Sequence, residues 1–242
     1  MQSALHLIYP PQCISCRDLV ESDNALCGKC WRDTPFISGL VCDKCGTPLL
    51  GGEAGEETSE SILCDDCMTI ARPWSHGRAA LLYKGNARKL VLALKHADRQ
   101  DLAVSGGIWM ATAAKAIITP KTLVAPVPLH WMRMLKRRYN QSALLAASLA
   151  KSAKLSYCSD LLLRNKRTRS LDGMGRDARF AMLNDSIKPN TRRRHRLIGR
   201  DILLVDDVMT TGATLAACAE ACLVAGAKEV SIITLARVAK DI

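Results

Sequence analysis

The chain has 242 residues, of which 48% are hydrophobic, and its mean hydropathy is +0.03. These values indicate a globular protein with room for one medium-sized domain and one small domain. No stretch approaches the roughly 20 apolar residues that span a membrane, and the apolar residues 4–9 lack the basic flank and cleavage site of a signal peptide. We therefore expect a cytoplasmic protein that does not insert into membranes.

The net charge of +11 is unevenly distributed along the chain. Residues 1–75 contain 5 Lys/Arg and 11 Asp/Glu, a net charge of −6, whereas residues 76–242 contain 29 and 12, a net charge of +17. This difference predicts two domains, 1–75 and 76–242, with different partners. The basic part is typical of proteins that bind nucleic acid or phosphorylated small molecules, and the alternative is a solvated basic surface.

Eight of the 11 cysteines form four C-x-x-C pairs near the start of the chain. In a reducing compartment this spacing favours metal ligation over disulfides. The pattern predicts two structural Zn²⁺ sites with four cysteine ligands each, because full coordination leaves no open position for catalysis. Sequential pairing assigns Cys13, Cys16, Cys27 and Cys30 to one ion and Cys42, Cys45, Cys64 and Cys67 to the other. An interleaved cross-brace is the alternative.

After a predicted domain boundary at residues 71–77, the hydrophobic pattern predicts strands that alternate with helices. In chain order we expect a strand at 78–83, a turn at 84–86, helices at 87–97 and 102–118, a strand at 122–127, a helix at 140–152, a brief strand at 161–164, a polar loop at 165–179, a buried strand at 202–206, a helix at 213–225 and a strand at 229–236. This alternation predicts an α/β fold with a parallel sheet and helices on both faces. Ligands of such folds bind outside the carboxyl ends of the strands.

Two carboxylates and a threonine-rich turn follow the predicted strand at 202–206. The turn consists of Thr210, Thr211, Gly212, Ala213 and Thr214. Because it opens a helix, its free N–H groups, its hydroxyls and the helix dipole suit a phosphate dianion. Asp206 and Asp207 would repel that phosphate, but they can accept hydrogen bonds from a ribose diol or hold a divalent metal. The segment predicts a site for ribose 5-phosphate, and the alternative is a strand–turn–helix without a ligand.

A second basic segment follows the strand at 122–127 and includes Arg137 and Arg138. Cations and exposed backbone donors just past a strand suit a pyrophosphate group. The segment alone favours a solvated turn, but together with the first site it predicts that Arg137 and Arg138 hold pyrophosphate. His130 is a candidate proton donor there or a surface histidine.

From residue 202 to 215 the sequence resembles the type I phosphoribosyltransferases, whose fingerprint is an apolar strand, two acids and a T-x-G-x-T-like loop. The resemblance implies that phosphoribosyl pyrophosphate (PRPP) with Mg²⁺ is the ligand and that Asp206 and Asp207 are the catalytic pair at the ribose. Purine-salvage members carry a further carboxylate three residues after the second acid. Thr210 stands at that position here, which disfavours purine salvage.

The four cysteine pairs, the transferase-like domain and the segment R-R-Y-N-Q at residues 137–141 together resemble the ComF (GntX-like) family, over nearly the whole chain. The family is linked to natural competence and DNA uptake, and it usually shows R-G-F-N-Q here. The basic loop at 164–179 resembles a mobile flap that closes over the ligand. Leu171, Ala178 and Met182 stand where the family usually has Gln, Glu and Asn, and these departures concern catalysis rather than PRPP binding.

The resemblance implies a competence or DNA-uptake protein that binds PRPP, transfers phosphoribose and contacts single-stranded DNA and DNA-uptake proteins. Residues 164–200 carry 12 Lys/Arg and 3 Asp, a density that suits DNA phosphates. Aromatic residues make up only 4% of the chain, which disfavours a base-stacking platform. Two alternatives stay open: a nucleic-acid-binding adaptor with a non-catalytic PRPP-sensing fold, and a salvage phosphoribosyltransferase for an unknown base.

Overall fold

The structure of the protein is a computed structural model that describes residue 6 and residues 9–50, 61–96, 99–129, 139–164 and 186–239. The predicted pyrophosphate ligands Arg137 and Arg138, together with His130 and residues 165–185 of the basic loop, lie outside the described residues.

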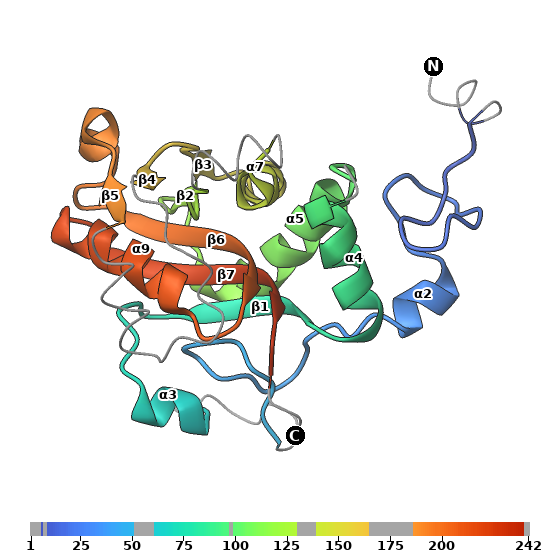
Figure 1. Ribbon diagram of the computed structural model, residues 1–242, viewed down its shortest axis with the longest axis horizontal. Coiled ribbons are helices and arrows are strands. Elements are labelled where there is room, and N and C mark those ends of the chain that lie inside the picture. Colours follow the sequence, from blue (N-terminus) through green and yellow to red (C-terminus); the bar gives the residue numbers. More distant parts are fainter. Residues whose placement is uncertain are drawn as a thin grey trace.

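Five parallel strands form the central sheet in the order β1-β7-β6-β2-β3 (Figure 1). They are β1 (Gly77–Leu82), β2 (Leu123–Pro126), β3 (Ser156–Tyr157), β6 (Asp201–Met209) and β7 (Glu229–Arg237). The three middle strands consist largely of continuous buried apolar residues, as a parallel sheet covered on both faces requires. The predicted α/β fold is confirmed.

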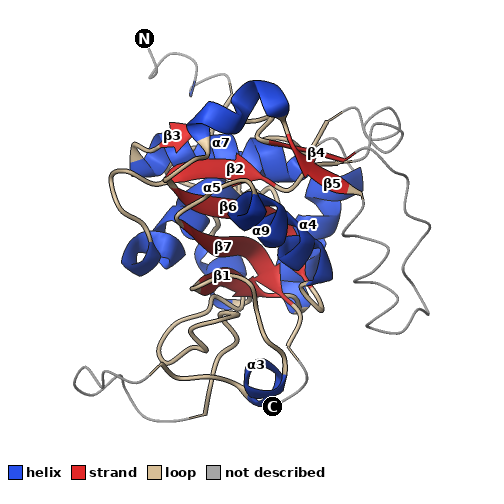
Figure 2. Cartoon of the chain, turned by 90° about the vertical axis from the view of Figure 1, so that its left-hand side faces the viewer, coloured by secondary structure: helices blue, strands red, loops and turns tan. Residues whose placement is uncertain are grey.

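Helices cover both faces of this sheet (Figure 2). α4 (Gly85–His96), α5 (Leu102–Ala114) and α7 (Gln141–Ala153) pack on one face, and α9 (Ala213–Val224) packs on the other. A short 3₁₀ helix, η1 (Lys115–Ile117), ends the predicted 102–118 segment. Two buried cores result, one on each side of the sheet.

Three short elements escaped the sequence-based prediction. β3 has two residues, β5 (Ile187–Pro189) pairs antiparallel with β4 (Leu162–Arg164), and η2 (Thr191–Arg196) is a 3₁₀ helix. Segments this short contain too few residues to show the hydrophobic periodicity from which helices and strands are predicted. β6 is also longer than predicted, because Asp206 to Met209 stay in register with Thr234 to Arg237 of β7. The two acids therefore lie within the strand.

The first cysteine-rich segment, with α2 (Gly28–Arg32), lies against α4 and α5 (Figure 1). Asn86 at the start of α4 donates to Thr34 Oγ1 at 2.8 Å, and Ser105 of α5 donates to the carbonyl oxygen of Asn24 at 2.6 Å. Phe36 packs edge-on against Trp109 with ring centroids 5.2 Å apart. Polar and aromatic contacts thus seat this segment on the three-helix face.

The second cysteine-rich segment, with α3 (Asp65–Thr69), lies below β1 in Figure 1. Gly77 N–H donates to the carbonyl oxygen of Asp43 at 2.7 Å, and Ser75 N–H donates to that of Val230 at 2.8 Å. Trp74 is only 2% exposed. Residues 71–77 are therefore packed along the sheet rather than forming a free linker, and the domain boundary placed there stays a prediction. Among the described helices, none has the length and apolar character needed to cross a membrane.

Candidate functional site: two cysteine tetrads and a phosphoribosyl-type loop

The eight cysteines of the C-x-x-C pairs converge in two groups of four. Within each group all sulfur atoms lie within 4.8 Å of one another, and the grouping is the sequential one: Cys13, Cys16, Cys27 and Cys30, then Cys42, Cys45, Cys64 and Cys67. Neighbouring sulfurs are 3.6 Å apart in both groups. A tetrahedral site with Zn–S bonds of about 2.3 Å requires sulfurs roughly 3.8 Å apart. The tetrads therefore fit structural zinc, and the interleaved pairing is excluded.

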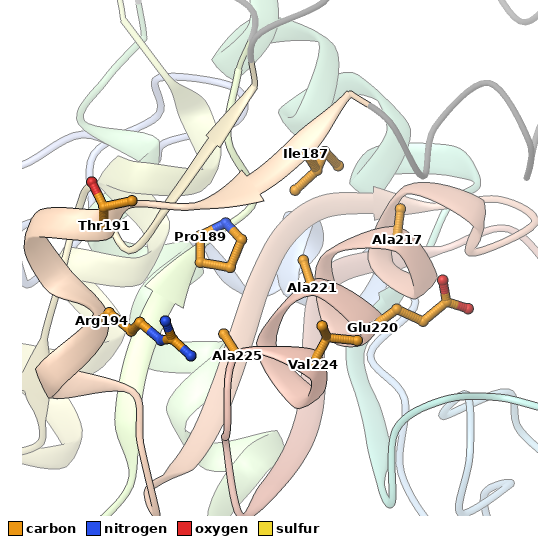
Figure 3. Close-up of a pocket in the computed structure, with 9 residues that line it drawn as sticks. All are labelled: Ile187, Pro189, Thr191, Arg194, Ala217, Glu220, Ala221, Val224 and Ala225. Atoms are coloured by element: carbon orange, nitrogen blue, oxygen red, sulfur yellow. The ribbon is translucent and has the colours of Figure 1, made fainter.

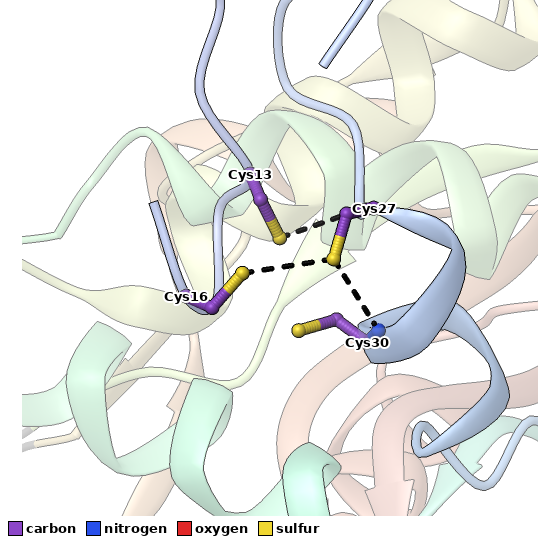
Figure 4. Close-up of side chains that lie close together, drawn as sticks. All are labelled: Cys13, Cys16, Cys27 and Cys30. Carbon is purple, nitrogen blue, oxygen red and sulfur yellow. Dashed lines mark hydrogen bonds between the residues drawn. The ribbon is translucent and has the colours of Figure 1, made fainter. Parts of the chain in front are cut away.

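Backbone N–H groups prepare the first tetrad for metal binding (Figure 4). Cys27 N–H donates to Cys13 Sγ at 3.3 Å, and Cys30 N–H donates to Cys27 Sγ at 3.5 Å. Burial raises the pKa of Cys13, but hydrogen bonds from the backbone of Cys16, Cys27 and Ser15 outweigh it and lower that pKa to about 6. Because zinc binds thiolates, this environment favours the ligating form of Cys13, whereas burial raises the pKa of Cys30.

The predicted phosphoribosyl residues lie at the topological switch point of the sheet. After β2 the chain continues through α7 to β3, whereas after β6 it continues through α9 to β7 on the opposite face. The two connections diverge from neighbouring strands, and ligands of open α/β sheets bind in the crevice that such divergence leaves. Just past the end of β2, Val127 N–H donates to the carbonyl oxygen of Val205 in β6 at 2.9 Å, and β6 continues beyond this contact to Met209.

Both acids at the end of β6 are held by side chains from the three-helix face. Ser142, in the first turn of α7, donates to Asp206 Oδ1 at 2.8 Å. Lys95 of α4 forms an ion pair with Asp207 Oδ2 at 3.2 Å. Neither Lys95 nor Ser142 was predicted as a site residue. Their positions depend on how α4 and α7 pack, which the local sequence does not specify.

The segment Tyr139-Asn140-Gln141 fixes the two helices that supply these partners. Tyr139 Oη donates to the carbonyl oxygen of Leu94 at 2.7 Å, and Gln141 Nε2 donates to that of Lys95 at 3.5 Å. Asn140 caps α7 by accepting from Ser142 N–H at 3.1 Å. The described part of the R-R-Y-N-Q segment thus positions the ends of α4 and α7 next to the acids.

Burial and the neighbouring charge of Asp207 raise the pKa of Asp206 to about 7. Between about pH 4 and pH 7, the folded state therefore keeps a proton on Asp206 that the unfolded chain has already released. As a result, this group's contribution to stability is lost as the pH rises through about 7. The ionised carboxylate accepts hydrogen bonds from both hydroxyls of a ribose diol through its two oxygens, whereas protonation converts one of these oxygens into a donor.

We expect the affinity for ribose 5-phosphate to fall below pH 7, by up to about tenfold per pH unit, because protonation of Asp206 removes the acceptor. Asp206→Asn should weaken binding and flatten this pH dependence. Calorimetric titrations of the wild type and of Asp206→Asn at a series of pH values test this. Ionisation of the ligand's own phosphate affects both proteins equally, so a difference between their pH dependences reports on Asp206. An equal pH dependence in both proteins would contradict the assignment.

The threonine-rich turn after β6 is shaped by Gly212, which has φ +81° and precedes α9. Arg72 Nη1 donates to the carbonyl oxygen of Thr211 at 2.7 Å, and the buried Arg237 donates to that of Thr210. In a trans peptide the next N–H points opposite to the carbonyl. The amides of Thr211 and Gly212 therefore face away from both arginines, and neither donates to another described residue. Amides at a helix start that have no partner among the described residues suit an anion.

In the structure, Asp206, Asp207 and residues 210–214 lie at one edge of the sheet, and their role as ligand-binding residues stays a prediction. The structure adds Lys95, Ser142, Arg72 and Arg237, none of which was predicted as a site residue. Arg237 could have been suspected, because it closes a strand whose other buried residues are mostly apolar. Arg72 lies in the predicted domain boundary and carried no signal.

An apolar hollow lies elsewhere, between β5, η2 and α9 (Figure 3). It has a volume of about 480 Å³ and is lined mainly by apolar side chains, with Arg194 and Glu220 on opposite sides. None of the residues from Asp206 to Thr214 lines it. This hollow is therefore separate from the predicted phosphoribosyl site.

The exposed arginines of η2 also lie away from that site. η2 precedes the first residue of β6, whereas the threonine-rich turn follows the last. Nine strand residues at about 3.3 Å each separate the two by roughly 25–30 Å. Arg193 pairs with Asp160 at 2.9 Å, while Arg192 and Arg194 are exposed. The basic cluster and the turn therefore occupy opposite edges of the sheet.

The three remaining cysteines are buried. Cys158, Cys218 and Cys222 are at most 2% exposed. Burial raises the pKa of Cys222 to about 12, so this thiol stays protonated at neutral pH.

Comparison with known proteins agrees with this architecture. The family described as "Double zinc ribbon domain" matches residues 4–68, and the family described as "Phosphoribosyl transferase domain" matches residues 135–241. The chain therefore combines a double zinc ribbon with a domain of the phosphoribosyltransferase type. A solved hypoxanthine-guanine phosphoribosyltransferase from Bacillus anthracis is 12% identical, with a TM-score of 0.38 over 59% of this chain and 75% of that chain, a likeness too low to support a conclusion.

Three curated proteins are similar over most of their length. "DNA utilization protein YhgH" of Escherichia coli K12 is 28% identical and covers 96% of this chain and 99% of its own. "Competence protein F" of Haemophilus influenzae is 26% identical, covering 93% and 96%. "Competence protein ComFC" of Bacillus subtilis is 26% identical, covering 90% and 87%. The chain is thus similar over nearly its whole length to proteins named for DNA utilization and competence, in agreement with the predicted resemblance to the ComF (GntX-like) family.

Proposed function

We propose that this protein binds PRPP at the carboxyl edge of the sheet. The observation that carries the proposal is the turn at Thr211 and Gly212, whose amides donate to no other described residue and which closely follows Asp206 and Asp207 in the chain. The turn would hold the 5-phosphate through these amides and the hydroxyls of Thr210, Thr211 and Thr214. Asp206 and Asp207 would accept the hydroxyls of the ribose. Phosphate and diol recognition at this spacing defines a ribose 5-phosphate site.

As an enzyme, the protein would transfer phosphoribose to an acceptor and release pyrophosphate from C1 of the ribose. Asp206 and Asp207 are the proposed catalytic pair, and Lys95 balances their charge. Arg137 and Arg138 are proposed to hold the leaving pyrophosphate. Mg²⁺, bound with PRPP, would neutralise the diphosphate charge. The oxygens of the two acids are the hard ligands that such an ion prefers.

Calorimetric titration of PRPP with Mg²⁺ into the full-length protein tests the proposal. We expect saturable binding by the wild type and none by Asp206→Ala/Asp207→Ala, with two zinc ions retained in both. Absence of heat with the wild type would refute it. A pyrophosphate-release assay with candidate nucleobases then addresses turnover, because a salvage transferase for a small base would release pyrophosphate with one of them.

A second proposal is that η2 contacts single-stranded DNA in the cytoplasm, where a DNA-handling role would place it together with DNA-uptake proteins. It is favoured by the exposed Arg192 and Arg194 and by relatives whose names refer to competence and DNA utilization. Electrostatic binding of this kind weakens as salt rises. This reading suits an adaptor with a non-catalytic PRPP-sensing fold, since the two surfaces lie at opposite edges of the sheet.

We expect Arg192→Ala/Arg194→Ala to weaken binding of a labelled oligonucleotide severalfold and to reduce the salt dependence, because two phosphate contacts are lost. Lys151→Ala/Lys154→Ala removes the same charge from the end of α7 and serves as the control. Fluorescence anisotropy at several salt concentrations gives both quantities. Equal loss in the two variants would indicate that only net charge matters.

A further inference from the structure

We propose that the second zinc ribbon is a structural part of the phosphate site, and that Arg72 is the positioning residue that couples metal binding at Cys42, Cys45, Cys64 and Cys67 to the turn at Thr211–Gly212. This inference rests on the proposed function, because it concerns the same turn. It assigns to the ribbon an indirect role in ligand binding, through Arg72 rather than through contact of a cysteine with the ligand.

The coupling begins in the chain just after the fourth cysteine of this tetrad. Cys67 lies in α3, and Arg72 follows it by five residues, past the end of that helix. Cys42, Cys45 and Cys67 are buried in the same core as Met209 and Ala213. The tetrad and the turn therefore share one packed interior, rather than belonging to two independently packed units.

Arg72 extends from this interior to the turn. Its Nη1 donates to the carbonyl oxygen of Thr211 at 2.7 Å, and its guanidinium carbon lies 5.4 Å from the ring centroid of Trp74. Trp74 is in turn fixed to the ribbon. Its indole N–H donates to the carbonyl oxygen of Lys44, and Lys44 Nζ donates to the carbonyl oxygen of Trp74 at 2.9 Å. Lys44 lies between the tetrad residues Cys42 and Cys45. Metal binding at the tetrad would therefore fix Lys44, and through it Trp74.

The packing around Gly212 is equally close. A Cβ atom at this position would lie 3.0 Å from Arg72 Nη1 and 3.2 Å from Trp74 Cη2. Residues supplied by the ribbon side thus form the wall behind the turn. By holding the Thr211 carbonyl, Arg72 also sets the direction of the Gly212 amide, because the peptide is planar.

Coupling between two binding sites is reciprocal. If metal binding orders Arg72, then a ligand in the turn must also stabilise the second ribbon. The first ribbon offers a matched comparison. Arg99 likewise donates to a zinc-ribbon carbonyl, that of Ile14 at 3.1 Å, but it contacts no described residue of the turn. Arg99→Met therefore removes an equivalent bridge at the other tetrad.

The test is hydrogen exchange with mass spectrometry on the full chain with both zinc ions, using ribose 5-phosphate as the probe. In the wild type we expect the ligand to slow exchange in residues 42–49 and 61–74 as well as in the turn, and not in residues 13–33. In Arg72→Met we expect protection of the turn only, and an affinity lower by about 10- to 100-fold, because a charged donor to the loop is lost. Arg72→Lys keeps a donor and should be intermediate.

Zinc content and melting temperature of each variant establish that it is folded. Arg99→Met should match the wild type in affinity and in its exchange pattern. If Arg72→Met bound within about twofold of the wild-type affinity, this inference would be overturned but the proposed function would stand. The same holds if the wild type bound the ligand without protection of residues 42–49 and 61–74. Failure of the wild type to bind ribose 5-phosphate would overturn the proposed function and this inference together.

Discussion

Replacing Cys45 by serine is expected to remove one of the two zinc ions and to lower the free energy of unfolding by more than about 5 kcal/mol. Structural zinc contributes roughly 10–16 kcal/mol of apparent binding energy in small zinc-binding units. Cys45 is fully buried, and its tetrad belongs to the core beneath β6 and α9. Loss of the ion therefore exposes the core next to the phosphoribosyl site. For a chain of this length the melting temperature should fall by roughly 10–20 °C.

Cys13→Ser is the matched control, because Cys13 is also a buried tetrad ligand. It should lose one zinc ion as well, but its tetrad contacts the three-helix face through residues such as Ile14 rather than the described turn. We expect it to retain binding of ribose 5-phosphate, which Cys45→Ser should lose. Elemental analysis, thermal melts and calorimetry measure the three quantities. Equal retention of binding in both variants would contradict the unequal roles of the two ribbons.

Gly212→Val is expected to abolish detectable binding of ribose 5-phosphate, with a loss of more than about 100-fold in affinity, equivalent to about 3 kcal/mol. Two causes act together. The backbone at Gly212 has φ +81°, which β-branched residues strongly avoid. A Cβ would also lie 2.7 Å from Met209 Cε. Both effects displace the amides that face the proposed phosphate. Calorimetric titration gives the affinity, and a melt gives the accompanying loss of stability.

Gly199→Val separates these causes. Gly199 also has positive φ, +67°, but a Cβ there meets no atom within 4 Å, and the residue lies at the amino edge of the sheet. It should cost about 1–2 kcal/mol of stability through backbone strain alone and leave ligand affinity unchanged. An equal loss of affinity in both variants would indicate a global effect of destabilisation and would count against a phosphate site at Gly212.

The parts of this fold that were predictable are those with a local cause in the sequence. The cysteine pairs predict the tetrads because zinc geometry limits which sulfurs can meet. The buried strand before Asp206 and the helix after Gly212 follow from apolar runs bounded by turn residues. The proposed phosphate turn is visible because it is a continuous segment. Sequential pairing of the cysteines was favoured, and the structure confirms it.

What escaped prediction depends on tertiary contacts. Ser142 and Lys95 reach the acids only because α7 begins and α4 ends at the same edge of the sheet, a consequence of strand order. Arg72 was placed in a linker because its neighbours Pro73 and Gly77 are typical of loops. The packing of Trp74 against Lys44 makes this segment part of the interior. The sequence shows which residues are present, but not that Trp74 and Lys44 contact each other in the fold.

The most direct test of the central claim is the response of the turn's own amides to ligand. In ¹⁵N-labelled full-length protein, addition of ribose 5-phosphate should shift the amide resonances of Thr211 and Gly212 strongly downfield in a saturable manner, because an N–H that donates to a phosphate is deshielded. The resonance of Gly199, at the other end of β6, should stay unchanged. Saturable binding that leaves Thr211 and Gly212 unshifted would contradict the account.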